Sequence, residues 1–292
     1  MNQATAPAMD LVGTTVLITG TSSGLGLYSA RELSKRGARV IATSRDVVRN
    51  RATLGDGDGT LEHEELDLAD LDSVTELARR ISARHPRLDI LINNAGVMMP
   101  PFTRTRQGFE LQFGTNHLGH FVLTALLFPL LSAAPRGRIV TVSSIAHKQA
   151  KLDLTRAVDE ATYDRALAYA DSKLANLLFA RELARRLERA NSRVVSVAAH
   201  PGVTETPLFR HFGLVQKAVG FFAAPVSEGA APLLQAALDP ALKPGSYLGP
   251  TGFREMRGKP GEAKLAPLAR NPELAQKLWS HSEELTGVPF TL

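Results

Sequence analysis

The chain has 292 residues, of which 44% are hydrophobic and 22% are charged, a balance typical of a soluble globular protein. It contains no cysteine, which excludes disulfides and thiolate metal sites. The formal net charge of +5 comes with arginines that are scattered along amphipathic segments and are not gathered with aromatic residues. This pattern argues against a nucleic-acid partner and suits an anionic cofactor.

The N-terminus gives no sign of a targeting segment. Residues 1–10 lack a charged region followed by an apolar core, and no run of 18 or more apolar residues occurs in the chain. No internal repeat or linker divides the sequence. We therefore expect a single domain over 1–292 and a cytoplasmic protein without a membrane span.

A short apolar run, Thr14–Thr19, leads directly into a glycine-rich stretch, Gly20–Gly26, and then into a helical pattern that stops at Gly37. Backbone amides at the start of a helix bind phosphate, and glycines let the backbone approach a pyrophosphate closely. The spacing is Gly-x3-Gly-x-Gly and differs from the Gly-x-Gly-x-x-Gly fingerprint. In this strand-to-helix context the stretch predicts a cofactor site, and a purely structural turn is the alternative.

Arg45 follows the next predicted strand, at the position that selects between nicotinamide cofactors. In dinucleotide folds an acidic residue here bonds the ribose hydroxyls, whereas an arginine accommodates a 2′-phosphate. Arg45, with Ser22 and Ser23 nearby, favours NADP(H) over NAD(H). Asp46 is the counter-argument, although it also suits the N-cap of the following segment. Asp67, at the end of the third strand, is expected near the adenine.

Strand and helix patterns alternate along the chain. The expected strands are 14–19, 39–43, 62–66, 89–92, 138–142, 193–198 and a short one near Tyr247. The expected helices after the first are 70–84, 107–131, 164–189, 227–238 and 272–285. Alternation of this kind predicts an α/β Rossmann fold, a doubly wound parallel sheet of about seven strands flanked by helices.

Tyr169 and Lys173 lie in the long helical segment 164–189. Four residues are just over one turn, so both side chains share a face, with Cβ atoms about 5 to 6 Å apart. A tyrosine has an ordinary pKa of about 10, and a neighbouring cation favours the phenolate. The pair therefore predicts an acid/base group whose pKa is lowered by Lys173. Surface decoration is the alternative interpretation of this spacing.

Several other polar residues stand in apolar surroundings. Asn116 lies within the apolar helix 107–131 and needs hydrogen-bond partners. His117 and His120 have no third ligand at matching spacing, so we expect structural roles and no metal site. Ser143 and Ser144 end the fifth strand, at the sheet edge where ligands bind.

The segment Pro207–Phe222 is apolar and aromatic and lies between prolines. It suits either a core helix or a lid over a hydrophobic substrate pocket. We divide the chain into a Rossmann core over about 12–250, an expected substrate lid over 204–226 and a C-terminal extension over 250–292.

Together these motifs resemble the short-chain dehydrogenase/reductase family. They are Thr19–Gly26, Asn93–Gly96, Asn116, Ser144, Tyr169 with Lys173, and Pro201–Gly202, in the family's order. The gap of 25 residues between Ser144 and Tyr169 is similar to that of the retinol-dehydrogenase-like branch. Five stretches also resemble this branch: Asn94–Met99, Asn116–Phe121, Val142–His147, Ser172–Asn176 and His200–Val203. Animal enzymes of that branch generally carry an N-terminal membrane anchor, which is not expected here.

The resemblance implies a role for each member of a tetrad. Tyr169 is the general acid/base, and Lys173 favours its phenolate and bonds the nicotinamide ribose. Ser144 polarises the substrate oxygen, with Ser143 as the alternative. Asn116 holds a water that links Lys173 to solvent. Family members are usually homodimers or homotetramers through the helices that hold Asn116 and Tyr169.

The implied cofactor site contains Gly20, Ser22, Ser23, Gly24, Leu25, Gly26, Arg45, Asp67, Leu68, Asn94, Ala95, Gly96, Tyr169, Lys173, Pro201, Gly202, Val203 and Thr204. The expected activity is NADP(H)-dependent hydride transfer to or from a hydrophobic alcohol or carbonyl, which Met98 and Met99 also favour. One rival is a regulator that binds NADP(H) without turnover. The other is the same enzyme acting on a steroid, a polyketide or an aryl ketone. The substrate, the direction and the oligomeric state are left open.

Overall fold

The structure, a computed structural model, describes residues 10–57, 60–155, 158–204 and 223–292. The expected lid or core helix at Pro207–Phe222 lies outside the described residues. The described strands form one sheet in the order β3-β2-β1-β4-β5-β6-β7-β8. The strands are β1 (Thr15–Thr19), β2 (Arg39–Ser44), β3 (Leu61–Glu65), β4 (Ile90–Asn93), β5 (Arg138–Val142), β6 (Val195–Ala199), β7 (Tyr247–Pro250) and β8 (Pro260–Glu262).

The sheet is doubly wound about β1, which lies between β2 and β4. The first seven strands pair in parallel, and β8 pairs antiparallel with β7 through Leu248 and Glu262. The predicted parallel sheet is confirmed, and its first six strands agree with the structure to within two residues at each end. The sequence did not predict β8, because Pro-Gly-Glu has no β-branched residue and the strand is defined by its bonds to β7.

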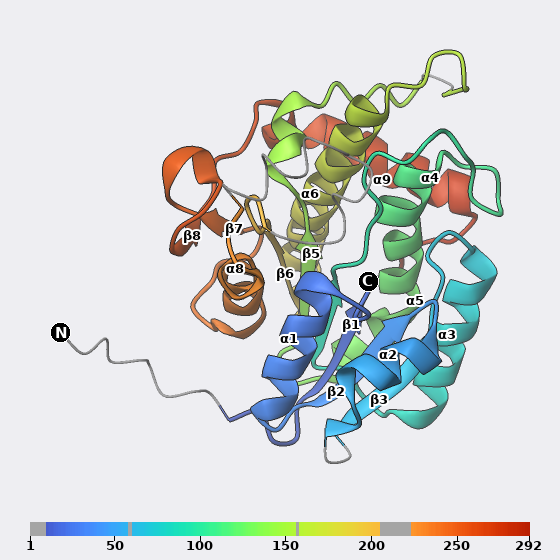
Figure 1. The fold of residues 1–292 in the computed structure, drawn as a ribbon. Helices are drawn as coiled ribbons and strands as arrows, with labels where there is room; N and C mark the ends of the chain where they lie inside the picture. Colours follow the sequence, from blue (N-terminus) through green and yellow to red (C-terminus); the bar gives the residue numbers. More distant parts are fainter. Residues whose placement is uncertain (1–9, 58–59, 156–157, 205–222) are drawn as a thin grey trace.

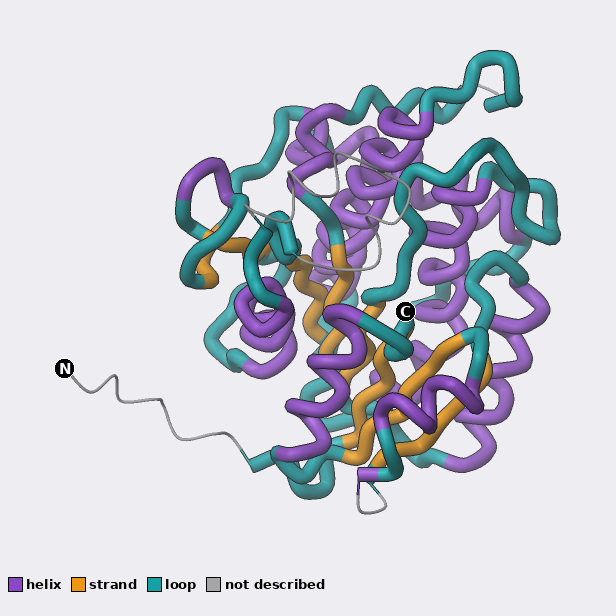
Figure 2. Tube along the Cα trace, viewed as in Figure 1, coloured by secondary structure: helices purple, strands orange, loops and turns teal. Residues whose placement is uncertain are grey.

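Helices cover both faces of the sheet (Figures 1 and 2). The helices are α1 (Gly24–Lys35), α2 (Val47–Leu54), α3 (Leu71–Arg84), α4 (Leu111–Phe113), α5 (Gly119–Ala133), α6 (Arg165–Arg189), α8 (Val226–Leu238) and α9 (Pro272–Thr286). One core lies between the sheet and α3, α5, α6 and α9, and another lies between the sheet and α1 and α8.

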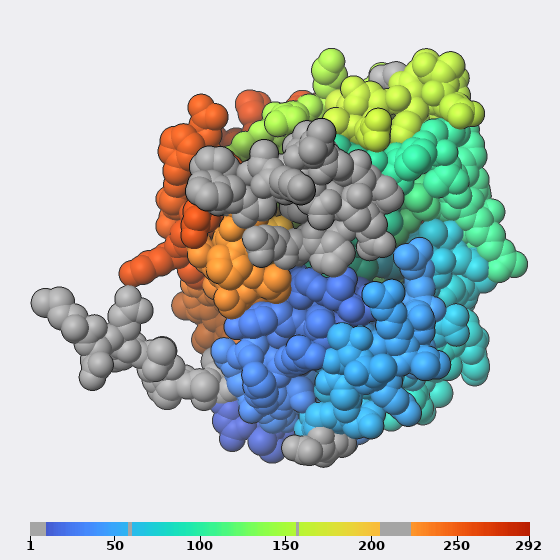
Figure 3. Space-filling view, in the orientation of Figure 1, coloured from blue at the N-terminus to red at the C-terminus, as the bar shows by residue number. Residues whose placement is uncertain are grey.

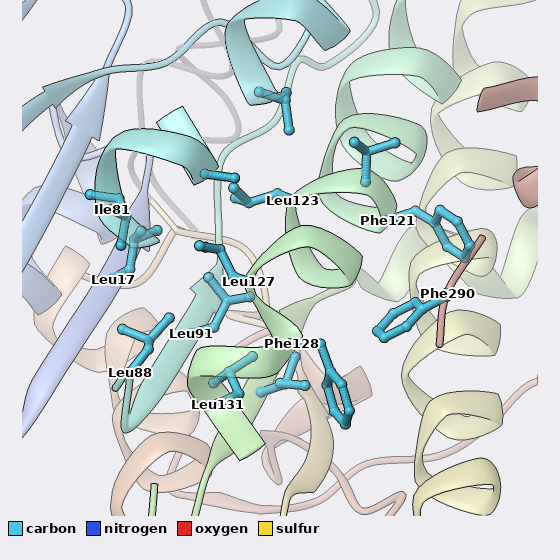
Figure 4. Packing of buried hydrophobic residues seen from close by; sticks show 14 of the residues in the cluster. Leu17, Ile81, Leu88, Leu91, Phe121, Leu123, Leu127, Phe128, Leu131 and Phe290 are labelled. Carbon is cyan, nitrogen blue, oxygen red and sulfur yellow. The ribbon is translucent and has the colours of Figure 1, made fainter. Parts of the chain in front are cut away.

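Alternate residues of one strand point into opposite cores, which explains why the strands are continuously apolar. Leu17 of β1 joins the core with α3 and α5, whereas Val16 and Ile18 join the core with α1 and α8. Figure 4 shows Leu91 beside Leu127 of α5 in the first core. Full burial of each such leucine stabilises the fold by about 1.5 to 3 kcal/mol.

The predicted helix at 107–131 is wrong in its start and in its continuity. Helical structure begins at Leu111, where the Glu110 carboxylate accepts hydrogen bonds from the amides of the first turn, and a π-helical segment, Gly114–Leu118, separates α4 from α5. The segment before it turns back on itself, with a bridge between Arg104 and Glu110. A helical hydrophobic period does not reveal a π segment, because a π turn differs from an α turn in its backbone bonds, here from the Gly119 amide to the Gly114 carbonyl.

The helical run Leu111–Ala133 is the one helix among the described residues that has the length and composition of a membrane span. Of its apolar window, 67% is buried within the protein. Phe121, Leu123 and Leu127 pack in the core against the sheet and α3. The protein's own core therefore accounts for the apolar composition of this helix.

An aromatic cluster fastens α9 and the C-terminus to α5 and α6. The Trp279 ring lies 5.4 Å from Phe121 and 5.8 Å from Phe179, and the Phe290 ring lies 4.9 Å from Trp279. The Arg186 guanidinium stacks over Trp279 at 4.3 Å. The expected dimer contact uses the helices that hold Asn116 and Tyr169. Because α9 packs on α5 and α6, a dimer contact through these two helices would have to include or avoid α9. Oligomeric state itself stays a prediction.

Candidate active site

A cavity of about 680 Å³ opens at the carboxyl ends of the parallel strands. Every residue predicted to bind cofactor lines it, and so do Ser144, Tyr169 and Lys173. These residues come from the ends of six strands and from α6, so the sheet brings together motifs that are spread over 185 residues, from Gly20 to Thr204. Asn116 is the one predicted catalytic residue that does not line the cavity.

The glycine stretch is a close-packed turn in which Gly20 and Gly26 leave no room for a side chain. Gly20 has φ of +75°, and a Cβ on it would lie 2.9 Å from the Cα of Ala95. A Cβ on Gly26 would lie 2.2 Å from the carbonyl oxygen of Gly20. These contacts bring the start of α1 directly against the end of β1 and beside the loop after β4.

Helix α1 begins in the cavity with its amides uncapped. No side chain bonds its first amides and no acidic residue stands in its first turn. In contrast, Asp46, Asp70, Asp164 and Asn271 cap the helices α2, α3, α6 and α9. Free amides and the positive end of a helix dipole attract a phosphate group. The geometry of this turn therefore suits the pyrophosphate of a dinucleotide.

The cavity wall beside the start of α1 also carries Ser22, Ser23 and Arg45. The Asp46 side chain accepts a hydrogen bond from the Arg49 amide at 2.9 Å and caps α2, which confirms its local role. Asp67 also lines the cavity, and its carboxylate accepts a bond from the Ala69 amide at 2.9 Å.

Tyr169 and Lys173 lie buried on one face of α6, where Leu174, Leu177 and Leu178 pack the rest of the helix into the fold. The Lys173 Nζ lies 5.8 Å from the centre of the Tyr169 ring and donates a hydrogen bond to the Val142 carbonyl at 3.2 Å. The main chain of β5 therefore fixes the position of the ammonium group.

The predicted lowering of the Tyr169 pKa is wrong for this structure. Burial raises the pKa of Tyr169 to about 12, and a hydrogen bond with Ser144 opposes the rise. Burial also lowers the pKa of Lys173 to about 8. The prediction considered only the charge of Lys173, because the desolvation of Tyr169 and Lys173 cannot be known from the sequence.

The two adjacent serines have different positions. Ser143 is 1% exposed and its hydroxyl donates a hydrogen bond to the Lys173 carbonyl at 2.7 Å, which ties β5 to α6. The hydroxyl of Ser144 accepts a bond from the Ala146 amide at 3.2 Å and also bonds Tyr169. Ser144 is therefore the serine whose hydroxyl meets the tyrosine.

Asn116 is fully buried behind the cavity wall. Its Oδ1 accepts a bond from the Val97 amide at 2.8 Å, and its Nδ2 donates to the Val97 carbonyl and to Ser172, each at 3.0 Å. Protein groups thus bind both polar atoms of the side chain, and its expected role of holding a water stays a prediction. In this structure the side chain fixes the loop after β4 against α6.

Both histidines of the same helical run have structural partners. His120 donates from Nδ1 to the Asn116 carbonyl at 2.9 Å, and its Nε2 lies 2.9 Å from the Thr19 hydroxyl. The His117 Nε2 bonds the Ser282 hydroxyl of α9 at 2.8 Å. Burial lowers the pKa of His117 to about 3 and that of His120 to about 4, so both rings stay neutral.

Sequence reasoning missed much of the wall around the catalytic end. The missed residues include Thr43, Ser44, Leu66, Ala69, Val97, Leu111, Thr115, Val142, Ile145, Ala146, Lys148, Gln149, Arg254 and Met256. Lys148 and Gln149 follow Ser144 closely in sequence, which is a signal that could have found them. Arg254 and Met256 come from the C-terminal extension and carry no motif.

Comparisons with known proteins agree with this arrangement. The family profile described as short chain dehydrogenase matches residues 14–214. The chain is 42% identical to retinol dehydrogenase 14 of Mus musculus, over 94% of this chain and 86% of that protein. It is 39% identical to retinol dehydrogenase 12 of Homo sapiens, over 96% of this chain and 88% of that protein.

Solved structures with the same fold extend the comparison. An uncharacterised protein from Mycobacterium Paratuberculosis matches with a TM-score of 0.79 and 40% identity, over 97% of each chain. The RhlG/NADP active-site complex of Pseudomonas aeruginosa matches with a TM-score of 0.67 and 25% identity, over 83% of this chain and 96% of that one.

Proposed function

Because this chain belongs to the short-chain dehydrogenase/reductase family, in its retinol-dehydrogenase-like branch, we propose an NADP(H)-dependent oxidoreductase that acts on a hydrophobic alcohol or carbonyl. One observation carries the proposal. The side chains of Ser144, Tyr169 and Lys173 meet in the cavity into which the uncapped start of α1 opens. The proposal keeps the cytoplasmic location expected from the composition.

The chemistry of these residues supports transfer of a proton at the substrate oxygen. When bound, the nicotinamide supplies or accepts the hydride. Tyr169 donates its phenolic proton to the carbonyl oxygen during reduction, and the phenolate accepts a proton from the alcohol during oxidation. Ser144 donates a hydrogen bond to the same oxygen and polarises it. The Lys173 ammonium stabilises the phenolate that forms.

Charge at the adenosine end supports NADP(H). Arg45 supplies a guanidinium and Ser22 and Ser23 supply hydroxyls along the wall, and these groups suit a 2′-phosphate. Asp46, the acidic residue that would favour NAD(H), is occupied as the cap of α2. The similar Pseudomonas aeruginosa structure is a complex with NADP, which is consistent with this choice.

The substrate end supports an apolar molecule. Met98, Leu111 and Ile145 line the cavity near Ser144, and the two relatives compared above are named for retinol. Retinal and retinol are therefore the first compounds to test, followed by steroids, polyketides and aryl ketones. The second candidate, a regulator that binds NADP(H) without turnover, has no need for three polar side chains gathered at the cavity.

The proposal is tested by titrating the protein with NADPH and NADH while recording fluorescence, and then by following NADPH consumption with a panel of apolar aldehydes and ketones. Tighter binding of NADPH than NADH, with turnover of a panel member, is the expected result. Tight binding without any turnover would support the regulator. Equal binding of both cofactors would contradict the NADP(H) assignment.

A further inference from the structure

His147 lies three residues after Ser144, in the short 3-10 helix Ile145–Gln149, and is 1% exposed. Both of its ring nitrogens are bonded. Nδ1 lies 2.7 Å from the Ser144 carbonyl oxygen, and Nε2 lies 3.2 Å from the Ala266 amide nitrogen. A carbonyl only accepts and an amide N–H only donates, so the ring carries its proton on Nδ1 and is neutral.

The ring therefore links the Ser144 carbonyl to Ala266, which lies 119 residues after His147 in the chain. The Ser144 carbonyl also accepts bonds from the His147 backbone amide at 3.1 Å and from the Tyr247 hydroxyl of β7 at 3.4 Å, and the Tyr247 ring packs edge-on against His147 at 5.5 Å. Strands β7 and β8 lie beside β5 and β6 at this edge of the sheet (Figure 1). The peptide of Ser144 is thus held from the C-terminal part of the chain.

The neighbouring residue strengthens the same connection. Lys148 forms an ion pair with Glu255 at 2.5 Å, and the second oxygen of Glu255 accepts a bond from the Lys264 amide at 2.8 Å. The Met256 carbonyl accepts a bond from the amide of Val203, a predicted nicotinamide-site residue, at 2.8 Å. The segment 255–266 therefore contacts both the serine loop and the loop after β6.

We propose that His147 is a positioning residue for the reaction. Its Nδ1–H holds the Ser144 carbonyl, and its Nε2 anchors the ring to the Ala266 amide. The Ser144 hydroxyl, which already accepts a bond from the Ala146 amide, is thereby held in one direction beside Tyr169. A hydroxyl held in this way meets the substrate oxygen without reorganising. This inference rests on the proposed oxidoreductase function.

Two substitutions separate the two bonds of the ring. In His147→Asn the side-chain amide reaches the place of Nδ1 and can donate to the Ser144 carbonyl, but it does not reach Ala266. In His147→Gln the side-chain amide reaches the place of Nε2 and can accept from the Ala266 amide, but the Ser144 carbonyl keeps only the Tyr247 hydroxyl and the backbone amide of residue 147 as donors. Each variant keeps one native hydrogen bond and loses one.

We expect kcat and hydrogen exchange to respond in opposite ways. His147→Gln lowers kcat about tenfold or more, because the serine is displaced, and keeps the Ala266 amide protected from exchange. His147→Asn keeps kcat within about threefold and releases the Ala266 amide to exchange. The KM for NADPH stays the same in both variants, since neither bond involves a residue predicted to bind the cofactor.

The matched control is His117→Gln, which replaces another buried histidine and keeps the bond from the Nε2 position to Ser282. Its melting temperature falls, while kcat stays within about twofold of wild type because the His117 ring bonds α9 and does not line the cavity. This control separates loss of stability from loss of serine position.

Each outcome decides the inference. The crossed pattern supports it. Equal loss of kcat in both His147 variants, in proportion to their melting temperatures, would show a merely structural role and overturn it. Wild-type kcat in His147→Gln would overturn it as well. Binding of NADPH by the wild-type protein without turnover of any substrate would overturn the proposed function and this inference with it. That result is distinguishable from the others because it is obtained with the wild-type protein.

Discussion

The two ends of the cavity are built in different ways. At the nucleotide end, the wall is the stretch Gly20–Gly26 with Arg45, and each part lies within a few residues of the strand that positions it. At the catalytic end, Ser144 and the neighbouring His147 are bonded by groups from β7 and from the segment 255–266. The proposed phosphate site is therefore built from local segments of the chain, whereas the position of Ser144 also depends on long-range bonds.

The space-filling view illustrates the same division. Residues of roughly the first third of the chain, in blue to cyan, fill the lower part of the face, and the segment after β7, in dark orange to red, lies at its left and upper left (Figure 3). Substitutions at the nucleotide end should therefore change cofactor affinity alone. Substitutions at Ser144 or His147 should change turnover or stability more than cofactor affinity.

The largest expected effect is that of Tyr169→Phe. This substitution removes the proton that reduction needs and keeps the ring, so turnover falls about 10²- to 10⁴-fold or below detection. Binding of NADPH, measured by fluorescence titration, remains nearly unchanged. Substantial residual turnover would remove Tyr169 from its assigned role.

The next effect is on stability. Trp279→Ala removes the centre of the aromatic cluster between α9, α5 and α6 and lowers the free energy of unfolding by about 3 to 5 kcal/mol. Denaturant unfolding measures this loss of stability. The control is Phe253→Ala, which also truncates an aromatic side chain but at an exposed position, so the free energy of unfolding changes little. Light scattering on both proteins also shows whether loosening α9 changes the oligomeric state.

A smaller effect follows at the nucleotide end. Arg45→Asp replaces a cation with an anion beside the expected 2′-phosphate and raises the KM for NADPH about tenfold to a hundredfold, because a charge-assisted bond is lost. The KM for NADH changes little, and kcat at saturating cofactor stays near the wild-type value. An unchanged ratio of the two KM values would remove the NADP(H) assignment.

The smallest effect is the pH dependence. Lys173 has a pKa lowered to about 8 by burial, so it is charged below that pH and neutral above it. We expect kcat/KM for NADPH in the reductive direction to fall by a few fold as the pH rises through about 8, since this parameter reports groups of the free protein. A profile that is flat from pH 6 to pH 10 would show that the Lys173 proton is not required.

Most of the fold could be predicted from local patterns. The apolar strands are recognisable because parallel strands are buried on both faces, and the caps Asp46, Asp70 and Asp164 mark helix starts through short-range hydrogen bonds. Strand β8 could not be predicted because its bonds to β7 define it, and the π segment Gly114–Leu118 could not because its local backbone bonds leave the helical hydrophobic pattern unchanged.

The sequence by itself determined the α/β class, the phosphate-binding turn and the pairing of Tyr169 with Lys173, because each follows from spacing along one element. The tertiary structure decided what surrounds them. Burial by neighbouring elements reverses the expected pKa shift of Tyr169, Val97 and Ser172 occupy the Asn116 side chain, and Ala266 completes the bonds of His147. Desolvation and long-range hydrogen bonding depend on which residues the fold brings together, and spacing in the sequence does not contain that information.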